Sequence, residues 1–286
     1  MAFNRVAIIG IGLIGGSFAL AARRAGWARE IIGVARSAET RRLALAAGVA
    51  DEVTADPAAA VRGADLVYLA TPVDTIVSLL GSLGPHLAPG ALVTDAGSAK
   101  AGIVAAAAAL PPSVRFVGGH PMAGSEQAGL AWASPDLFAG AHYFLTPTAA
   151  TDPAALAQLQ ELVPALGAVP VLVDPAEHDR RVALTSHLPH LLAWALCRAA
   201  SEGDSPERLA PFTAGAWRDT TRIAASSPEL WAEILLANRK AVQEAAGRWE
   251  QCLDELLTAL EAGDREALVA ALAEAREFHG RMQTSE

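Results

Sequence analysis

One histidine stands in a glycine-rich segment that could carry proton-transfer chemistry. The segment reads Gly118-Gly119-His120-Pro121-Met122-Ala123-Gly124-Ser125-Glu126, and the apolar run 114–117 before it predicts a short buried strand. Paired glycines allow a sharp turn and Pro121 fixes one torsion, so we expect His120 at the mouth of a turn, beside the Glu126 carboxylate. An imidazole placed in this way exchanges a proton near neutral pH. The plainer alternative is a surface loop whose histidine caps a backbone group.

A second chemical signal is the motif G-x-G-x-x-G, formed by Gly10, Gly12 and Gly15. It lies between an apolar run of strand length and an alanine-rich helical pattern, the context typical of a dinucleotide site. Gly10 would make the tight turn, Gly12 would let the backbone approach a pyrophosphate, and Gly15 would let the helix pack closely on the strand. The helix N-terminus at Leu13 and Ile14 would face the phosphates. The alternative is a glycine-rich turn without a ligand.

The end of the second predicted strand, residues 30–35, bears on the choice of cofactor. NAD-binding proteins of this kind usually carry an acidic residue there for the ribose 2′-hydroxyl. This chain has Arg36 and Ser37 instead, and the first acidic residue, Glu39, belongs to the next predicted helix. A guanidinium and a hydroxyl suit a 2′-phosphate, so the sequence favours NADP over NAD. If Arg36 only stacks on the adenine, either cofactor could serve.

Two further strand ends carry candidate site residues. The predicted strand 65–70 ends in Thr71 and Pro72, and the predicted strand 91–95 leads through a turn that contains Ser98. Ligands of parallel sheets bind outside the carboxyl ends of the strands, so we expect Thr71 and Pro72 to line the cofactor cleft. Ser98 could aim its hydroxyl into the same cleft. A serine at a helix start is also commonly only a cap.

Polar residues also interrupt the helical pattern of the second half. His187 and His190 are three residues apart and share a neighbouring helix face, while Pro189 between them should kink the helix. No third ligand with metal-site spacing is evident, so we interpret the pair as substrate contacts, with helix packing as the alternative for one of them. Arg218 and Arg222 are four apart and suit carboxylates; a solvated charged face is the alternative.

The elements that must position these residues fall into two parts. Strand and helix patterns alternate over residues 1–174, which predicts a doubly wound α/β domain that binds a dinucleotide. From Pro175 onward only helix-period apolar spacing occurs, so residues 175–286 are predicted to form a helical domain for substrate binding and dimerisation. A helical domain so rich in alanine and leucine often packs against a second copy, and we therefore expect a homodimer.

Composition limits the class of protein. The chain has 286 residues, a net charge of −9 and two cysteines, which argues against a general nucleic-acid binder and against a disulfide framework or metal cluster. The uncharged stretch 6–22 could pass for a signal-peptide core, but its glycines make a poor membrane helix and are explained by the dinucleotide motif. We expect a soluble cytoplasmic protein.

Taken together, the motifs resemble the prephenate/arogenate dehydrogenase family of tyrosine biosynthesis, over almost the whole length. The glycine fingerprint is shared by many families, whereas the other four motifs, in this order, are highly specific. The five are Gly10-x-Gly12-x-x-Gly15, Asp95-x-Gly97-Ser98-x-Lys100, Gly119-His120-Pro121-x-Ala123-Gly124-Ser125-Glu126, Ser186-His187-Leu188-Pro189-His190 and Asp219-x-Thr221-Arg222-Ile223-Ala224.

The resemblance implies oxidative decarboxylation of a cyclohexadienol by a homodimer. It implies that His120 takes the proton of the ring hydroxyl as hydride leaves for the nicotinamide, and that Ser98 orients His120 and touches the hydroxyl. Arg222 would bind a substrate carboxylate and His190 would face the side-chain end. The remaining candidates for substrate binding are His187, Arg218, Ser125 and Glu126.

The chain departs from many family members where it carries Ala35-Arg36 in place of an acidic residue. It stops after the helical part, so neither a tyrosine-sensing domain nor a second activity is expected. A β-hydroxyacid dehydrogenase would need a lysine in the helix that starts at Pro175, which has none; a non-catalytic NADP-binding regulator would not need His120, Ser98 and Arg222 together. The sequence does not decide between prephenate and arogenate, nor whether tyrosine inhibits.

Overall fold

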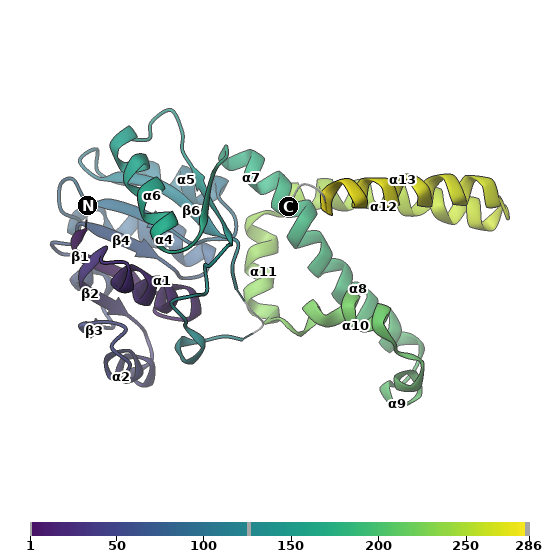
Figure 1. Ribbon diagram of the computed structural model, residues 1–286, viewed down its shortest axis with the longest axis horizontal. Coiled ribbons are helices and arrows are strands. Elements are labelled where there is room, and N and C mark those ends of the chain that lie inside the picture. Colours follow the sequence, from purple (N-terminus) through teal and green to yellow (C-terminus); the bar gives the residue numbers. More distant parts are fainter. Residues whose placement is uncertain (1, 125–126, 284–286) are drawn as a thin grey trace. The chain divides into compact units, whose positions relative to one another are not determined.

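The computed structural model describes residues 2–124 and 127–283, and the chain forms two compact units, Met1–Arg239 and Lys240–Glu286. The first unit contains a twisted sheet covered by helices and then a series of helices (Figure 1). The domain boundary predicted at residues 174 and 175 falls within this first unit, at the start of α7, and remains a prediction. No helix among the described residues is long and apolar enough to cross a membrane.

The sheet has eight strands in the order β3-β2-β1-β4-β5-β6-β7-β8. The first six in this order run parallel, β7 is antiparallel to β6, and β8 is parallel to β7. The predicted doubly wound α/β fold is thus confirmed, with two strands at one edge, β7 and β8, that run opposite to the other six. The strands are β1 (Phe3–Ile9), β2 (Ala28–Val34), β3 (Glu52–Thr54), β4 (Leu66–Leu69), β5 (Leu92–Asp95), β6 (Arg115–Pro121), β7 (His142–Thr146) and β8 (Val169–Leu172).

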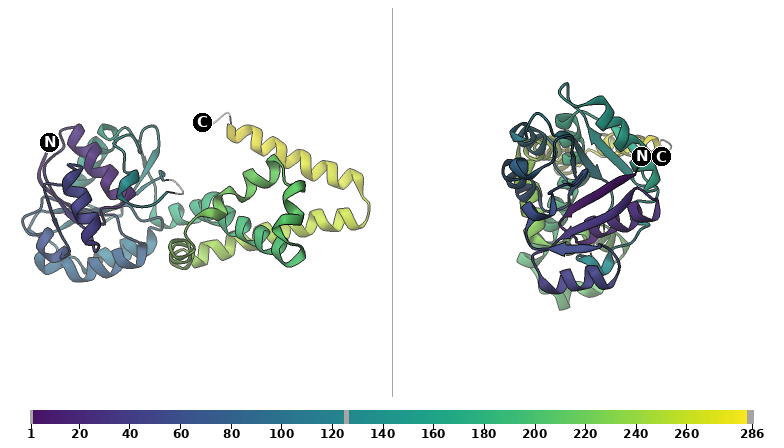
Figure 2. Two further views of the ribbon diagram at one scale, coloured as in Figure 1. Left: turned by 90° about the horizontal axis from the view of Figure 1, so that it is seen from below. Right: turned by 90° about the vertical axis from the view of Figure 1, so that its left-hand side faces the viewer.

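Helices cover both faces of the sheet and bury a separate apolar cluster on each (Figures 1 and 2). Phe18 of α1 and Leu159 of α6 belong to one cluster, and Ile76 and Leu80 of α4 belong to the other. Parallel sheets of this kind are covered by helices on both faces. The helices of this part are α1 (Leu13–Arg24), α2 (Ala38–Ala46), α3 (Pro57–Ala60), α4 (Val73–Leu83), α5 (Ala101–Ala106) and α6 (Pro153–Ala165).

The turn predicted at Gly118 and Gly119 is wrong, because both residues lie in extended β6, which continues through His120 to Pro121. Glycine is needed at these two positions because neighbouring atoms lie too close for a side chain. A Cβ on Gly118 would lie 2.4 Å from Thr146 Oγ1, and one on Gly119 would lie 2.6 Å from the Asp95 carbonyl oxygen. β6 pairs with β5 up to Val117 and with β7 from Gly118 to Pro121, so His120 is held by a strand rather than by a turn.

The rest of the first unit is helical, as predicted. Ordinary α-helical hydrogen bonding is interrupted by a π-helical turn, Ala183–His187, and α8 then begins with Pro189 in its first turn. The helical backbone continues from α7 through this turn into α8, so the irregularity expected around Pro189 is a π-helical turn just before it and not an end of the helix. The elements are α7 (Pro175–Val182), α8 (Leu188–Gly203), α9 (Pro206–Leu209), α10 (Gly215–Thr221), a 3₁₀ turn (Arg222–Ala225) and α11 (Pro228–Ala237).

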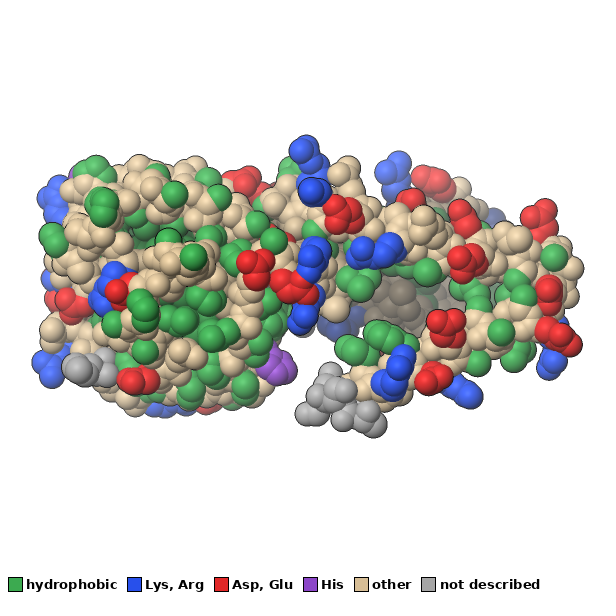
Figure 3. All heavy atoms as spheres, turned by 90° about the horizontal axis from the view of Figure 1, so that it is seen from above, with side chains coloured by type: hydrophobic (Ala, Val, Ile, Leu, Met, Phe, Trp, Pro, Cys, Tyr) green, Lys and Arg blue, Asp and Glu red, His purple; other side chains and the backbone are tan. Residues whose placement is uncertain are grey.

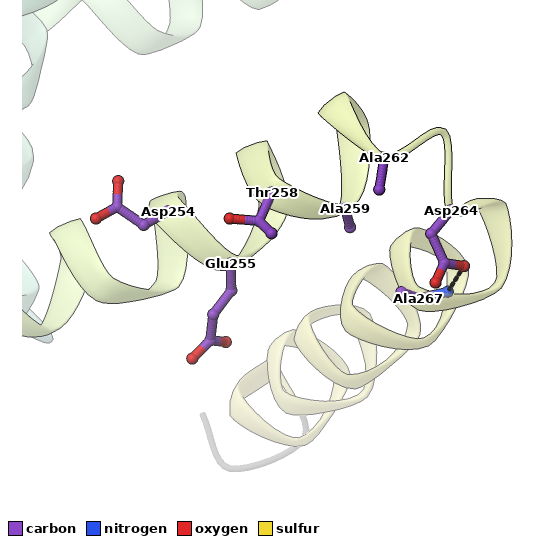
Figure 4. A pocket seen from close by; sticks show the side chains of 7 residues that line it. All are labelled: Asp254, Glu255, Thr258, Ala259, Ala262, Asp264 and Ala267. Carbon is purple, nitrogen blue, oxygen red and sulfur yellow. Dashed lines mark hydrogen bonds between the residues drawn. The ribbon is translucent and has the colours of Figure 1, made fainter.

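The second unit is a helical hairpin of α12 (Arg239–Glu261) and α13 (Arg265–Gln283). Near its turn lies a shallow pocket of about 440 Å³ (Figure 4), where the Asp264 carboxylate accepts a hydrogen bond of 2.9 Å from the Ala267 N–H. Apolar side chains remain exposed along the hairpin (Figure 3), and α13 buries none of its residues. They include Leu257, Leu260, Val269, Leu272, Phe278 and Met282.

Candidate active site

A cleft of about 890 Å³ lies in the first unit, between the carboxyl ends of the parallel strands and the helices that follow α7. Crossover connections bring the loops after β1, β4 and β5 to this edge of the sheet, where ligands of such folds bind. Most of the predicted site residues line this one cleft although they are spread over more than 200 positions. They are Gly12, Leu13, Ile14, Arg36, Thr71, Pro72, Ser98, His120, His187, His190 and Arg222.

The other predicted site residues do not line the cleft or are not described. Gly10 adopts φ 98°, and a Cβ on Gly15 would lie 2.2 Å from the Gly10 carbonyl oxygen. Both glycines therefore allow the conformation of the turn and do not contact the cleft. Ser37 caps α2 by accepting hydrogen bonds from two backbone N–H groups. Arg218 lies in α10 and is not among the residues that line the cleft. Ser125 and Glu126 lie outside the described residues.

The first turn of α1 fits the pyrophosphate of a dinucleotide. Gly12 is the N-cap of this helix, no side chain caps it, and no acidic residue lies in its first turn. A Cβ on Gly12 would meet nothing within 4 Å, so the backbone there faces open space. Uncapped N–H groups at the start of a twelve-residue helix offer hydrogen bonds and partial positive charge to phosphates.

The loop after β2 places a cation and no carboxylate at the cleft. Arg36 lines the cleft, and it forms no ion pair with any of the described residues. Arg41 donates from Nη1 to the carbonyl oxygens of Ala35 and Arg36, at 2.8 Å and 2.6 Å, and so holds this loop. The Ser37 hydroxyl accepts from the Glu39 N–H at 3.2 Å and retains its own proton to donate.

His120 combines a buried ring with a position on the cleft wall. Its Nδ1 lies 2.8 Å from Nε2 of His178, and its ring lies 6.4 Å from that of Phe144. Burial lowers the pKa of His120 well below 6.5, and the neighbouring His178, Lys100 and His187 lower it further. The imidazole is therefore neutral at pH 7, the state in which it can accept a proton.

A hydrogen-bonded chain behind His120 was not predicted from the sequence. His178 Nδ1 lies 2.8 Å from Asp179 Oδ1, and Asp179 also accepts the backbone N–H groups of Lys100, at 2.7 Å, and Ala101, at 2.9 Å. His178 and Asp179 are both buried. A signal was present, because the two residues fall on the face of α7 that carries the buried residues Pro175 and Val182 at helical spacing. Polar groups on a buried face require partners.

The backbone beside His120 is held by a buried ion pair. Lys100 Nζ pairs with the Asp95 carboxylate and donates to the Gly119 carbonyl oxygen at 2.7 Å. The other Asp95 oxygen accepts the Gly119 N–H at 3.1 Å, so both polar groups of Gly119 are engaged. Burial lowers the pKa of Lys100, while the Asp95 charge opposes this. Asp95 and Lys100 belong to the same sequence motif as Ser98, and here they fix β6 one residue before His120.

The far end of the cleft is aromatic. His190 stacks on Trp231 with ring centroids 3.5 Å apart, and His187 meets Trp231 edge-on at 5.9 Å. Burial lowers the pKa of His187 to about 4 and also lowers that of His190, which Arg222 lowers further. Both rings are therefore neutral at pH 7. Trp231 was missed, because no local signal separates it from a core tryptophan in an apolar helix.

The lining of the cleft is suited to an anion. Among the described lining residues, Arg36 lies toward the cofactor end and Arg222 toward the aromatic end, and no aspartate or glutamate occurs. The described residues contain no group of three or more His, Cys, Asp or Glu side chains that could hold a metal ion. Two guanidinium groups at opposite ends suit two separate anionic groups, one on the cofactor and one on a substrate.

Comparison with known proteins points to one family. The sequence pattern described as "Prephenate dehydrogenase, nucleotide-binding domain" matches residues 18–172, and "Prephenate dehydrogenase, dimerization domain" matches residues 174–274. The prephenate dehydrogenase of Bacillus subtilis (strain 168) is 37% identical over 278 residues, which cover 96% of this chain and 75% of that protein.

Solved structures agree. The prephenate dehydrogenase of A. aeolicus, in complex with hydroxyphenyl propionate and NAD+, is 32% identical, with a TM-score of 0.91 and coverage of 99% of each chain. The arogenate dehydrogenase of Synechocystis is 34% identical, with a TM-score of 0.83 and coverage of 97% of this chain and 99% of that one.

Proposed function

Since the chain belongs to the prephenate dehydrogenase family, we propose that it oxidises prephenate with NADP⁺ and that His120 is the base of the reaction. The chain is an NAD(P)-dependent dehydrogenase, and its reaction is the oxidative decarboxylation of prephenate or arogenate. Family membership also decides against the β-hydroxyacid dehydrogenase alternative. One observation carries the assignment of His120: its neutral imidazole lies on the same cleft as the glycine turn and Arg222.

In the proposed mechanism, His120 accepts the proton of the substrate's ring hydroxyl. The nicotinamide, when bound, supplies the acceptor for the hydride that leaves the same carbon. The electron pair of the bond to the ring carboxylate then enters the ring, CO₂ departs and the ring becomes aromatic, and the ring oxygen takes the proton back from His120. Because aromatisation favours the products, the residues of this chain mainly have to position the substrate and remove one proton.

Three residues around the reacting hydroxyl and the carboxylate complete the proposal. Ser98 lines the cleft and donates or accepts a hydrogen bond at the ring hydroxyl. Arg222 binds a substrate carboxylate with its planar fork of donors. His190, held against Trp231 and hydrogen-bonded through Nδ1 to the Ser186 carbonyl oxygen at 3.0 Å, faces the substrate's side chain.

Prephenate is the proposed substrate because of the charges along the cleft. Arogenate differs by an ammonium group in place of the keto oxygen, and a buried ammonium needs a carboxylate or several acceptors. No described lining residue carries a carboxylate, and His187 and His190 are neutral. The described lining thus suits the keto acid, and Glu126, between the lining residues Gly124 and Gln127, lies outside the described residues.

We also propose a homodimer that packs through the helical part. Residues 174–274 match a dimerisation domain, and the hairpin of α12 and α13 leaves apolar residues such as Leu260 and Phe278 exposed. A second copy that covers these side chains would remove them from water.

Arg36→Ala is expected to change the choice of cofactor. The guanidinium is proposed to bind the 2′-phosphate, so its loss should raise KM for NADP⁺ by about 10- to 100-fold, the value of one charge-assisted hydrogen-bonded contact. The kcat/KM for NAD⁺ should change by less than about threefold, because NAD⁺ has no phosphate there. Arg42→Ala, an exposed arginine nearby, is the control. Equal losses with both cofactors would remove Arg36 from phosphate recognition.

The proposal as a whole is tested by initial rates with prephenate and arogenate, each with NAD⁺ and NADP⁺, measured as reduced cofactor. Prephenate with NADP⁺ is expected to give the highest kcat/KM of the four mixtures. A highest value with arogenate would reverse the substrate choice. Absence of turnover in all four mixtures, with folded protein that binds cofactor, would overturn the proposed function.

A further inference from the structure

We propose that His178 and Asp179 fix the tautomer of His120, so that its proton sits on Nδ1 and Nε2 is the basic nitrogen. The two would then be positioning residues for the reaction, acting through His120. The inference rests on the proposed role of His120 as the base. It starts from the chain of contacts His120–His178–Asp179, whose two links each measure 2.8 Å.

The direction of the chain follows from its last member. A carboxylate only accepts hydrogen bonds, and that of Asp179 already accepts the backbone N–H groups of Lys100 and Ala101. Backbone N–H groups cannot reverse their role, so Asp179 is held as an acceptor. The nitrogen that faces it, Nδ1 of His178, must therefore carry the proton.

The proton positions on the two histidines then follow. A neutral imidazole has one protonated and one unprotonated nitrogen, so a proton on Nδ1 leaves Nε2 of His178 as an acceptor. The Nδ1 of His120 faces this acceptor and must donate. A neutral His120 with its proton on Nδ1 has its lone pair on Nε2. The scheme takes both rings as neutral, and a neutral His120 agrees with the low pKa that burial and the nearby Lys100 cation give this ring.

Three segments of the protein hold this hydrogen-bonded series of side chains in place. His120 comes from β6, His178 and Asp179 come from α7, and the two N–H groups come from the start of α5. Asn238 donates from Nδ2 to the Asp179 carbonyl oxygen at 2.8 Å and contacts Nδ1 of His187 at 3.2 Å. The hydrogen-bonded series is thus held in place at Asp179, the acceptor that determines the direction of its hydrogen bonds.

Asp179→Asn tests this direction. Asp179 Oδ1 faces His178 Nδ1 and accepts the Lys100 N–H, while Oδ2 accepts the Ala101 N–H. An amide whose oxygen keeps the Ala101 contact places its NH₂ at the Oδ1 position, where it forces His178 Nδ1 to accept. His178 then carries its proton on Nε2, and His120 carries its proton on Nε2, where it cannot act as a base. We expect kcat to fall by about 10²–10⁴-fold, as for the equivalent change behind a catalytic histidine, with KM for prephenate changed by less than about threefold.

A spectroscopic measurement separates this role from a merely structural one and needs no substrate. The ¹⁵N chemical shifts of the imidazole nitrogens report which nitrogen is protonated, and the His120 signals are identified by their loss in His120→Asn. Wild-type His120 is expected to be protonated on Nδ1, and Asp179→Asn is expected to move the proton to Nε2. A wild-type His120 protonated on Nε2 would overturn the inference even if the enzyme turns over prephenate.

Variants of His178 provide a second test should Asp179→Asn not fold. A glutamine carbonyl can accept from His120 Nδ1, so His178→Gln should keep kcat within about tenfold of wild type. His178→Phe keeps an aromatic ring against Phe144, 5.3 Å away, but has no acceptor and should lose as much kcat as Asp179→Asn. Equal activity of the two variants would contradict the inference.

Asp51→Asn is the matched control. Asp51 also accepts a backbone N–H, that of Ile31 at 2.8 Å, and pairs with an arginine, Arg23, but it does not line the cleft. Its variant is expected to keep kcat and the His120 tautomer. A fall in kcat there equal to that in Asp179→Asn would assign the effect to general loss of structure.

Discussion

His120→Asn is expected to lower kcat by about 10²–10⁴-fold, the contribution typical of a general base, with little change in cofactor binding. Asparagine keeps an N–H that can reach His178 Nε2, so the hydrogen bond behind the ring survives while the proton acceptor at the Nε2 position is lost. Steady-state rates with prephenate measure the first effect, and titration of cofactor binding by fluorescence measures the second.

The control is His142→Asn, which changes an exposed histidine of β7 outside the cleft. Activity of His120→Asn comparable to that of the control would remove His120 from the mechanism. The pH profile adds an independent check. Because burial lowers the pKa of His120 below 6.5, the wild-type kcat/KM should stay constant down to pH 6.5 and fall only below it, as the ring gains a proton. That acid limb should disappear from any residual activity of the variant.

Arg222→Ala is expected to raise KM for prephenate by about 10- to 100-fold, since a hydrogen bond to a charged group contributes about 1.5–3 kcal/mol. Arg222 lines the cleft beside His190, whose pKa it helps to lower, and the described residues form no ion pair with it. Its charge is thus available to a substrate carboxylate. The kcat should fall less than kcat/KM if the contact is equally strong in the ground state and the transition state.

Two further variants sharpen this test. Arg222→Lys retains the charge but loses the planar fork, so its KM should lie between those of the wild type and Arg222→Ala. Arg198→Ala removes an exposed arginine of α8 that does not line the cleft, and its KM should equal that of the wild type. An unchanged KM in Arg222→Ala would place Arg222 on a structural face of the helical part.

Local sequence patterns were sufficient for the fold and for much of the cleft. The motif formed by Gly10, Gly12 and Gly15 was enough to predict the dinucleotide turn. Gly10 has a positive φ, and a Cβ on Gly15 would lie 2.2 Å from the Gly10 carbonyl oxygen, so neither position accepts a side chain. Ser98 and His120 were found because each follows a predicted strand of a parallel sheet, and such strand ends converge on one edge. Periodicity and the topology of parallel sheets therefore determined which residues meet.

The sequence by itself thus determined the fold class, the dinucleotide turn and the candidates His120 and Arg222. The tertiary structure alone decided that Gly118 and Gly119 are extended, because the atoms they must clear belong to Thr146 and Asp95. It also decided which residues stand behind His120. His178 lies 58 positions further along the chain, and the pattern of α7 predicts only that its buried face needs partners. Which partners those are depends on how β6, α5 and α7 pack, and no local pattern encodes that packing.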